Sequence, residues 1–132
     1  MVPESRPKGP DQRGSATILA VAAIAVVLLL AGTIVIVAGY VLAARRAGQA
    51  ADLAAVSAAR TIDFGEPGCP ITERIARDNG ARLVRCDHVG DAIEFAVTVE
   101  VLVSVRPPLP GLPSSVSGKA SAGQLGVTAE QG

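Results

Sequence analysis

The longest hydrophobic stretch of the chain is an unbroken run from Ser15 to Ala44. These 30 residues contain no charged side chain and are mostly Ala, Val, Ile and Leu. About 20 apolar residues in a helix cross the hydrocarbon core of a bilayer, whereas 30 residues extend for about 45 Å. The run therefore predicts a transmembrane helix over residues 15–44 that tilts or projects beyond the lipid.

A helical composition continues past the end of this run. Residues 45–62 are rich in alanine, which has the highest helix propensity, and contain no proline. We therefore expect the transmembrane helix to continue as a helical extension to about Thr61. The small or apolar side chains expected to support a compact domain are Ala51, Leu53, Ala54, Ala55, Val56, Ala58 and Ala59.

A short second helix is expected after a turn. The segment 63–68 is rich in turn-forming residues, and Pro70 suits the first turn of a helix. The helix is expected to cover Ile71 to Asn79, with Gly80 just beyond its end, where glycine often terminates helices.

The period of the pattern then changes from helical to strand-like. From Ala92 to Arg106 the odd-numbered positions, Ile93 to Val105, are all apolar, and most even-numbered positions are polar or small. This alternation predicts a strand with the odd-numbered face buried and its glutamates, Glu94 and Glu100, exposed. Leu83 to His88 is expected to pair with it through a turn at Gly90 and Asp91.

The remaining C-terminal sequence predicts one more strand. The segment Pro107 to Pro113 is proline-rich and is expected to be a stiff surface connection, because proline donates no ladder hydrogen bond. Ser114 to Gly123 is the expected third strand, and Val127 to Gly132 is expected to be a frayed tail.

These elements predict an α+β protein: a long N-terminal helix, a short helix and a small antiparallel sheet. The expected organisation is as follows: leader 1–14, transmembrane helix 15–44, helical extension 45–62, small α+β domain 63–106, proline-rich connection 107–113, and a last strand with a flexible tail 114–132.

Composition and charge argue against two large classes of function. Twelve basic and twelve acidic residues balance, so no basic surface favours nucleic acid. A single histidine, two cysteines and no tryptophan leave few catalytic side chains. His88 follows Asp87, but neighbouring strand residues point to opposite faces. We expect no enzyme activity, no catalytic or metal site and no cofactor.

The apolar run is expected to remain as an anchor. A cleavable signal peptide is the alternative, because Arg6, Lys8 and Arg13 precede the run and Val41 to Ala43 resembles a cleavage site. The run is too long for an ordinary signal peptide, which favours retention. Arg45, Arg46 and the more distant Arg60 balance the three basic residues of the leader, so the count of charges does not set the orientation.

Two cysteines bracket the expected short helix. Cys69 lies just before it and Cys86 in the first expected strand. In an exported domain, such a pair most simply forms a disulfide; free thiols and a metal site with His88 are the alternatives. The pair and the short leader favour a cytoplasmic N-terminus and an exported C-terminal domain.

Three residues inside the apolar run are candidates for specific roles. Gly32 and Gly39 are seven positions apart, close to one helical face, where a second helix can approach closely. Tyr40 lies four residues before the run ends and is expected to sit at the membrane interface.

The two ends of the apolar run resemble those of a known family. Arg13-Gly14-Ser15-Ala16-Thr17 stands at its entrance and Ala50-Ala51-Asp52-Leu53-Ala54-Ala55 just beyond its exit; a cysteine pair and a valine-rich strand follow. This arrangement resembles the TadE-like pseudopilins of actinobacterial tight-adherence (Flp-type) pilus and secretion loci. The similarity covers about residues 11–106 and extends weakly to 117–123.

The resemblance implies a non-catalytic, pilin-like envelope protein. Its implied partners are the lipid bilayer, other pilin-like subunits, a secretion platform and a prepilin peptidase that cuts between Gly14 and Ser15. The expected function is that of a minor pilin; the alternative is an accessory membrane-anchored binding or scaffold protein of an envelope complex. Pilins carry a glutamate five positions after the processing glycine, where this chain has Leu19.

Overall fold

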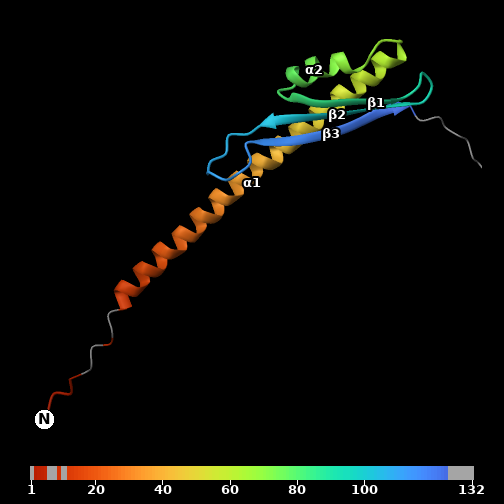
Figure 1. Ribbon diagram of the computed structural model, residues 1–132. Helices are drawn as coiled ribbons and strands as arrows, with labels where there is room; N and C mark the ends of the chain where they lie inside the picture. Colours follow the sequence, from red (N-terminus) through yellow and green to blue (C-terminus); the bar gives the residue numbers. More distant parts are fainter. Residues whose placement is uncertain (1, 6–8, 10–11, 125–132) are drawn as a thin grey trace, which may run out of the picture. The chain divides into compact units, whose positions relative to one another are not determined.

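The computed structural model describes residues 2–5, 9 and 12–124 and contains two helices and three strands within them (Figure 1). The chain divides into two compact units, Met1–Val37 and Ala38–Gly132. The elements are α1 (Gln12–Asp63), α2 (Cys69–Asp78), β1 (Arg82–Gly90), β2 (Phe95–Ser104) and β3 (Ser115–Gln124). The predicted α+β class is confirmed.

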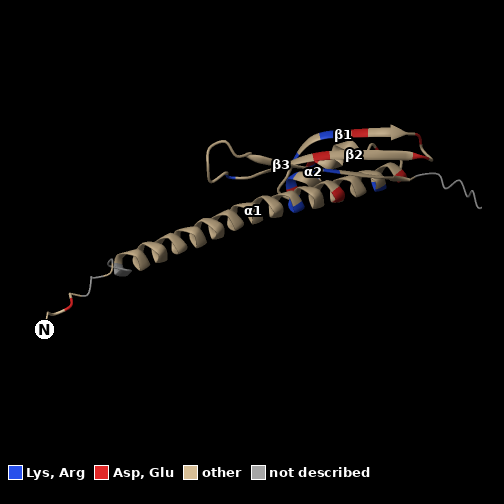
Figure 2. Cartoon of the chain, turned by 90° about the horizontal axis from the view of Figure 1, so that it is seen from below, with Lys and Arg blue, Asp and Glu red and all other residues tan. Residues whose placement is uncertain are grey.

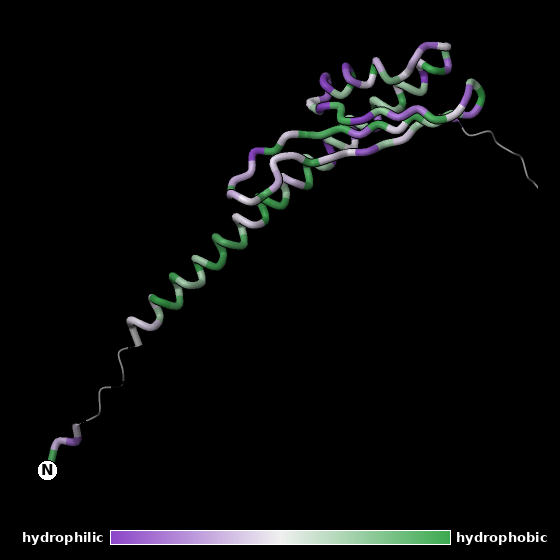
Figure 3. The backbone as a smooth tube through the Cα atoms, in the orientation of Figure 1, coloured by the Kyte–Doolittle hydropathy of each residue, from purple (hydrophilic) through white to green (hydrophobic). Residues whose placement is uncertain are grey.

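The described part of the first unit consists mainly of the N-terminal half of α1. Its large apolar side chains are exposed, including Ile18, Leu29 and Val35. Figure 3 shows much of this half of the helix coloured as hydrophobic, and Figure 2 shows it without charged residues beyond its grey start, in agreement with the charge-free sequence from Ser15 to Ala44. Within the described residues, α1 is the one helix long and apolar enough to cross a membrane.

The second unit is built on a ridge of alanines. Because α-helix residues three and four apart share a face, the alanines of α1 line up along one side of the helix. They are completely or almost completely buried: Ala43, Ala47, Ala50, Ala51, Ala54, Ala55 and Ala58. The same core contains the inward-facing residues of β2, namely Phe95, Val97, Val99, Val101 and Val103. Small helix side chains thus allow the sheet to approach the helix backbone closely.

Two residues expected on this supporting face lie elsewhere. Leu53 and Val56 remain 51% and 46% exposed. Each residue advances an α-helix by about 100°, so these positions point away from the face that Ala51, Ala54 and Ala58 form. The prediction was wrong for these two side chains, which belong to the outer surface of α1.

The sheet is antiparallel, with β2 between β1 and β3. Along β2 the side chains alternate between buried and half-buried, as the sequence predicts for Phe95 to Val103. The pairing with β1 shifts between Leu83 and Arg85, whereas the pairing with β3 is regular throughout. At Gly118 on β3, an added Cβ would collide with the backbone of Ala47, so this strand lies directly on α1.

The hairpin between β1 and β2 is longer than expected. The oxygen Oδ1 of Asp91 accepts hydrogen bonds from the backbone N–H groups of Ile93 and Glu94, both at 2.9 Å. These bonds hold the pKa of Asp91 below its usual value and take both N–H groups out of the strand ladder. The strand therefore begins at Phe95, and the prediction that Ile93 is buried was wrong: it is 75% exposed.

The short helix α2 begins and ends close to its predicted limits. Gly80 has a positive φ of 73°, and the N–H of Ala81 reaches the carbonyl of Ala76 at 2.9 Å, which closes the helix C-terminus. At the other end, an added Cβ at Gly68 would lie 2.7 Å from the carbonyl oxygen of Ala58 on α1. Glycine at this position therefore permits the close approach of the α2 N-terminus to α1.

Two other predicted limits differ slightly from the structure. The long helix ends at Asp63, two residues beyond Thr61, and β3 begins at Ser115 instead of Ser114. The predicted frayed tail, Val127 to Gly132, lies outside the described residues, as do Arg6, Lys8 and Asp11 of the leader.

Candidate functional site

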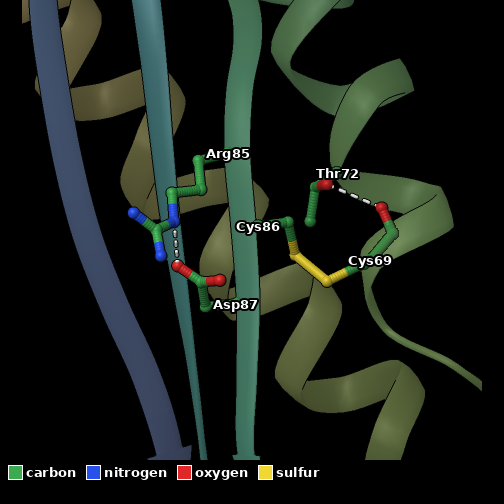
Figure 4. The surroundings of a disulfide bond; sticks show 5 residues. All are labelled: Cys69, Thr72, Arg85, Cys86 and Asp87. Atoms are coloured by element: carbon green, nitrogen blue, oxygen red, sulfur yellow. Dashed lines mark hydrogen bonds and ion pairs between the residues drawn. A yellow bond between two sulfur atoms is a disulfide. The ribbon is translucent and has the colours of Figure 1, made fainter.

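A disulfide joins the first residue of α2 to β1. Cys69 and Cys86 are bonded, with their Cα atoms 5.8 Å apart (Figure 4). Beside it, the hydroxyl of buried Thr72 donates a hydrogen bond to the carbonyl of Cys69 at 2.6 Å. Ala76 of α2 is buried in the main core. The disulfide expected from the sequence is present, and it ties α2 to the sheet.

Replacing both cysteines by serine is expected to lower the free energy of unfolding by about 3 kcal/mol, because the bond closes a loop of 17 residues in the unfolded chain. Urea unfolding of the full-length protein in detergent, followed by far-ultraviolet circular dichroism, measures this difference. Reducing agent should destabilise the wild type equally and leave the variant unchanged. Alkylatable thiols in the unreduced, denatured wild type would contradict the disulfide.

The outer face of the sheet carries charged side chains that neutralise one another. Arg85 forms an ion pair with Asp87 on β1, and half-buried Glu100 on β2 is in register with Arg85 on one side and Lys119 on the other. These residues line an open hollow together with His88, Val89 and Thr98. The face is polar, as the alternation predicts, but Glu100 is more covered than expected.

The isolated histidine is not paired with a neighbouring carboxylate. His88 is in register with Val97, a core residue, whereas Asp87 is in register with Thr98 on the outer face. The ring of His88 lies edge-on to Phe95, with centroids 6.1 Å apart. Within the described residues, no three His, Cys, Asp or Glu side chains gather as a metal site would require.

The outer surface of α1 in the second unit combines apolar and charged residues. Leu42, Leu53 and Val56 are about half exposed, and none of them is covered by the sheet. Around them lie exposed charges of both signs: Arg45, Arg46, Asp52, Arg60 and Asp63. A helix surface of this kind, with apolar residues flanked by opposite charges, is typical of helix-to-helix contacts.

The remaining candidate residues on α1 are the predicted processing pair, the two glycines expected to pack against a second helix, and Tyr40. Gly14 and Ser15 are exposed in the first turn of the helix, where backbone N–H groups have no partner in the preceding turn. No atom lies within 4 Å of a Cβ built at Gly14, Gly32 or Gly39. Tyr40 is half-buried, and its hydroxyl donates a hydrogen bond to the carbonyl of Pro113 at 2.7 Å.

The fold defines the class of protein: a small disulfide-bonded α+β domain that follows a long apolar helix, which is a candidate membrane span. Residues 14–61 match the model of the family described as "Putative Flp pilus-assembly TadE/G-like". The match confirms the TadE-like resemblance and supports a pilus-related, structural role.

The family match coincides with α1 alone. It starts at Gly14 and ends two residues before the helix does, so α2 and the three strands lie outside it, in contrast to the wider similarity expected from the sequence. No curated protein and no solved structure matches the chain.

Proposed function

We propose that the protein is a minor pilin-like subunit of a tight-adherence pilus or secretion assembly, anchored in the membrane by α1. The observation that carries this proposal is that the family match covers the whole apolar segment of α1 and its alanine-rich extension. The pilin-like contact would be made by the exposed helix, and the sheet would supply a domain outside the membrane. No catalytic step is part of this function.

In this proposal the N-terminus lies in the cytoplasm and the domain is exported. The disulfide supports this orientation, because disulfides persist in oxidising compartments outside the cytoplasm. A prepilin-type peptidase would cut between Gly14 and Ser15, at the edge of the apolar run. The cut would leave an N-terminus that starts directly with the apolar helix and enters a bundle of other helices.

Leu19 favours a second candidate, an accessory anchored scaffold protein that does not enter a filament. It is 74% exposed and stands where pilins of this type have a glutamate. A buried carboxylate in a helix bundle needs a partner charge, and this pairing aligns neighbouring subunits. Without this glutamate, the subunit lacks one means of aligning with its neighbours when many copies are incorporated along a filament. A subunit at the tip or base of a filament requires only a few contacts.

Mass spectrometry of the protein from the membrane fraction tests the proposal. A mature N-terminus at Ser15 is expected for a pilin-like subunit, and deletion of the host's prepilin peptidase should restore the full leader. An intact leader in the wild type would favour the scaffold candidate. A soluble product beginning at Ala44 would contradict both, because it would have lost the membrane helix.

Photocrosslinking distinguishes the two candidates by their neighbours. Val35 lies on the same side of the helix as Gly32 and Gly39, whereas Ile34 points the opposite way. Both side chains are exposed to a similar extent, 71% and 68%, so they form a matched pair. A photoreactive residue at Val35 is expected to capture pilin-type subunits, and one at Ile34 to capture mainly lipid. Equal capture from both positions would contradict packing through the glycine face.

A further inference from the structure

One end of the loop between β2 and β3 is held at a defined position along the axis of α1. The hydrogen bond from the Tyr40 hydroxyl to the carbonyl of Pro113 joins the end of this loop to the helix. Tyr40 belongs to the charge-free run, which continues to Ala44. The end of the loop therefore lies beside the apolar part of α1.

The position of Tyr40 along α1 corresponds to the membrane interface if α1 spans the bilayer. The charge-free run of about 45 Å matches a bilayer measured with its headgroup zones, 40–45 Å. Val41 and Leu42 are still about half exposed, and the first charges after the run are Arg45 and Arg46. Tyrosine is enriched at the headgroup level, so Tyr40 and the loop bonded to it fall in that zone.

The chemistry of the loop suits this environment. Residues 107–113 carry no charge, and four of the seven are prolines, which have no backbone N–H to leave unpaired in lipid. Leu109 is 57% exposed. Arg106, just before the loop, is exposed as well, and its guanidinium is suited to a headgroup phosphate.

We propose that residues 107–113 form a second membrane contact, in which Leu109 enters the interfacial zone of the bilayer and Arg106 binds lipid phosphate. The occupant is lipid because the loop is bonded to Tyr40, and the next two residues of the membrane helix, Val41 and Leu42, keep about half of their apolar surface exposed. This inference rests on the membrane anchoring proposed above. It adds a contact made by the folded domain to that made by the helix.

Single tryptophans test the contact directly, because the chain contains no tryptophan. The full-length variants Leu109→Trp, Val35→Trp and Phe64→Trp are reconstituted in vesicles of phosphatidylcholine and phosphatidylglycerol. Leu109, Val35 and Phe64 are all exposed, so the larger ring fits at each position; Phe64, 87% exposed in the turn after α1, is the water-facing control. Quenching is measured with aqueous iodide and with lipids brominated near the headgroup.

The tryptophan at position 109 is expected to be quenched by brominated lipid and several-fold less by iodide than that at position 64. Equal iodide quenching at positions 109 and 64, with position 35 quenched by lipid, would overturn the loop contact but leave the anchor intact. Protection of position 109 from both quenchers would mean that protein covers the loop, which also overturns the proposal. Failure of lipid quenching at position 35 would remove the membrane anchor and the loop contact together.

Discussion

Val99→Asp is expected to unfold the second unit or to destabilise it by about 3–5 kcal/mol, because it places an uncompensated charge in the core. Val99 lies in the middle of the central strand β2 and is completely buried. Nothing polar in this core is available to pair with the carboxylate, since its members are alanine, valine and phenylalanine side chains.

The neighbouring substitution Glu100→Gln is the matched control. Glu100 points to the outer face between Arg85 and Lys119, so losing its charge is expected to cost about 1 kcal/mol or less. Urea unfolding of the full-length variants in detergent, followed by circular dichroism, measures both effects. Equal destabilisation by the two substitutions would show that the assigned faces of β2 are wrong.

Gly118→Ala is expected to destabilise the same unit by about 3 kcal/mol, the upper end of the range for overpacking. A Cβ at this position would overlap the backbone carbonyl of Ala47, and a backbone cannot move aside as a flexible side chain can. Either β3 separates from α1 or the helix bends. Both would open the contact between the alanine ridge and the sheet.

Gly48→Ala is the control for this second prediction. Gly48 lies on α1 next to Ala47, yet a Cβ there meets no atom within 4 Å. Because alanine has a higher helix propensity than glycine, this change is expected to be neutral or to stabilise by up to about 1 kcal/mol. Thermal unfolding compares the two variants. A similar loss of stability from both substitutions would indicate that replacing any glycine destabilises the unit, and that the close contact at Gly118 is not the cause.

The charged side chains of the sheet lie opposite one another on its outer face. Arg85, Asp87, Glu100 and Lys119 neutralise one another on the outer face of the sheet, and the described residues bring no metal-binding group together. Most of the exposed large apolar side chains of the described residues belong to α1. This distribution is what a structural subunit requires, because its task is to present helix and domain surfaces to lipid and protein.

The sequence by itself determined those features that follow from local pattern. Three such patterns each define an element without reference to the rest of the chain. They are the charge-free run longer than a bilayer core, the alternation of apolar and polar residues with period two, and the glycine that follows the short helix. The helices, the three strands and the disulfide partners were accordingly predicted to within a few residues. The family resemblance was also local, since it depends on the two ends of one helix.

The tertiary structure alone decided what depends on contacts between distant residues. Pattern could not place Leu53 and Val56 on the outer side of α1, because the buried side of an alanine-rich helix is set by the sheet that packs on it. The side-chain bonds of Asp91 moved the start of β2 to Phe95. The bond between Tyr40 and Pro113 joins residues 73 positions apart, and nothing near either residue in the sequence indicates it.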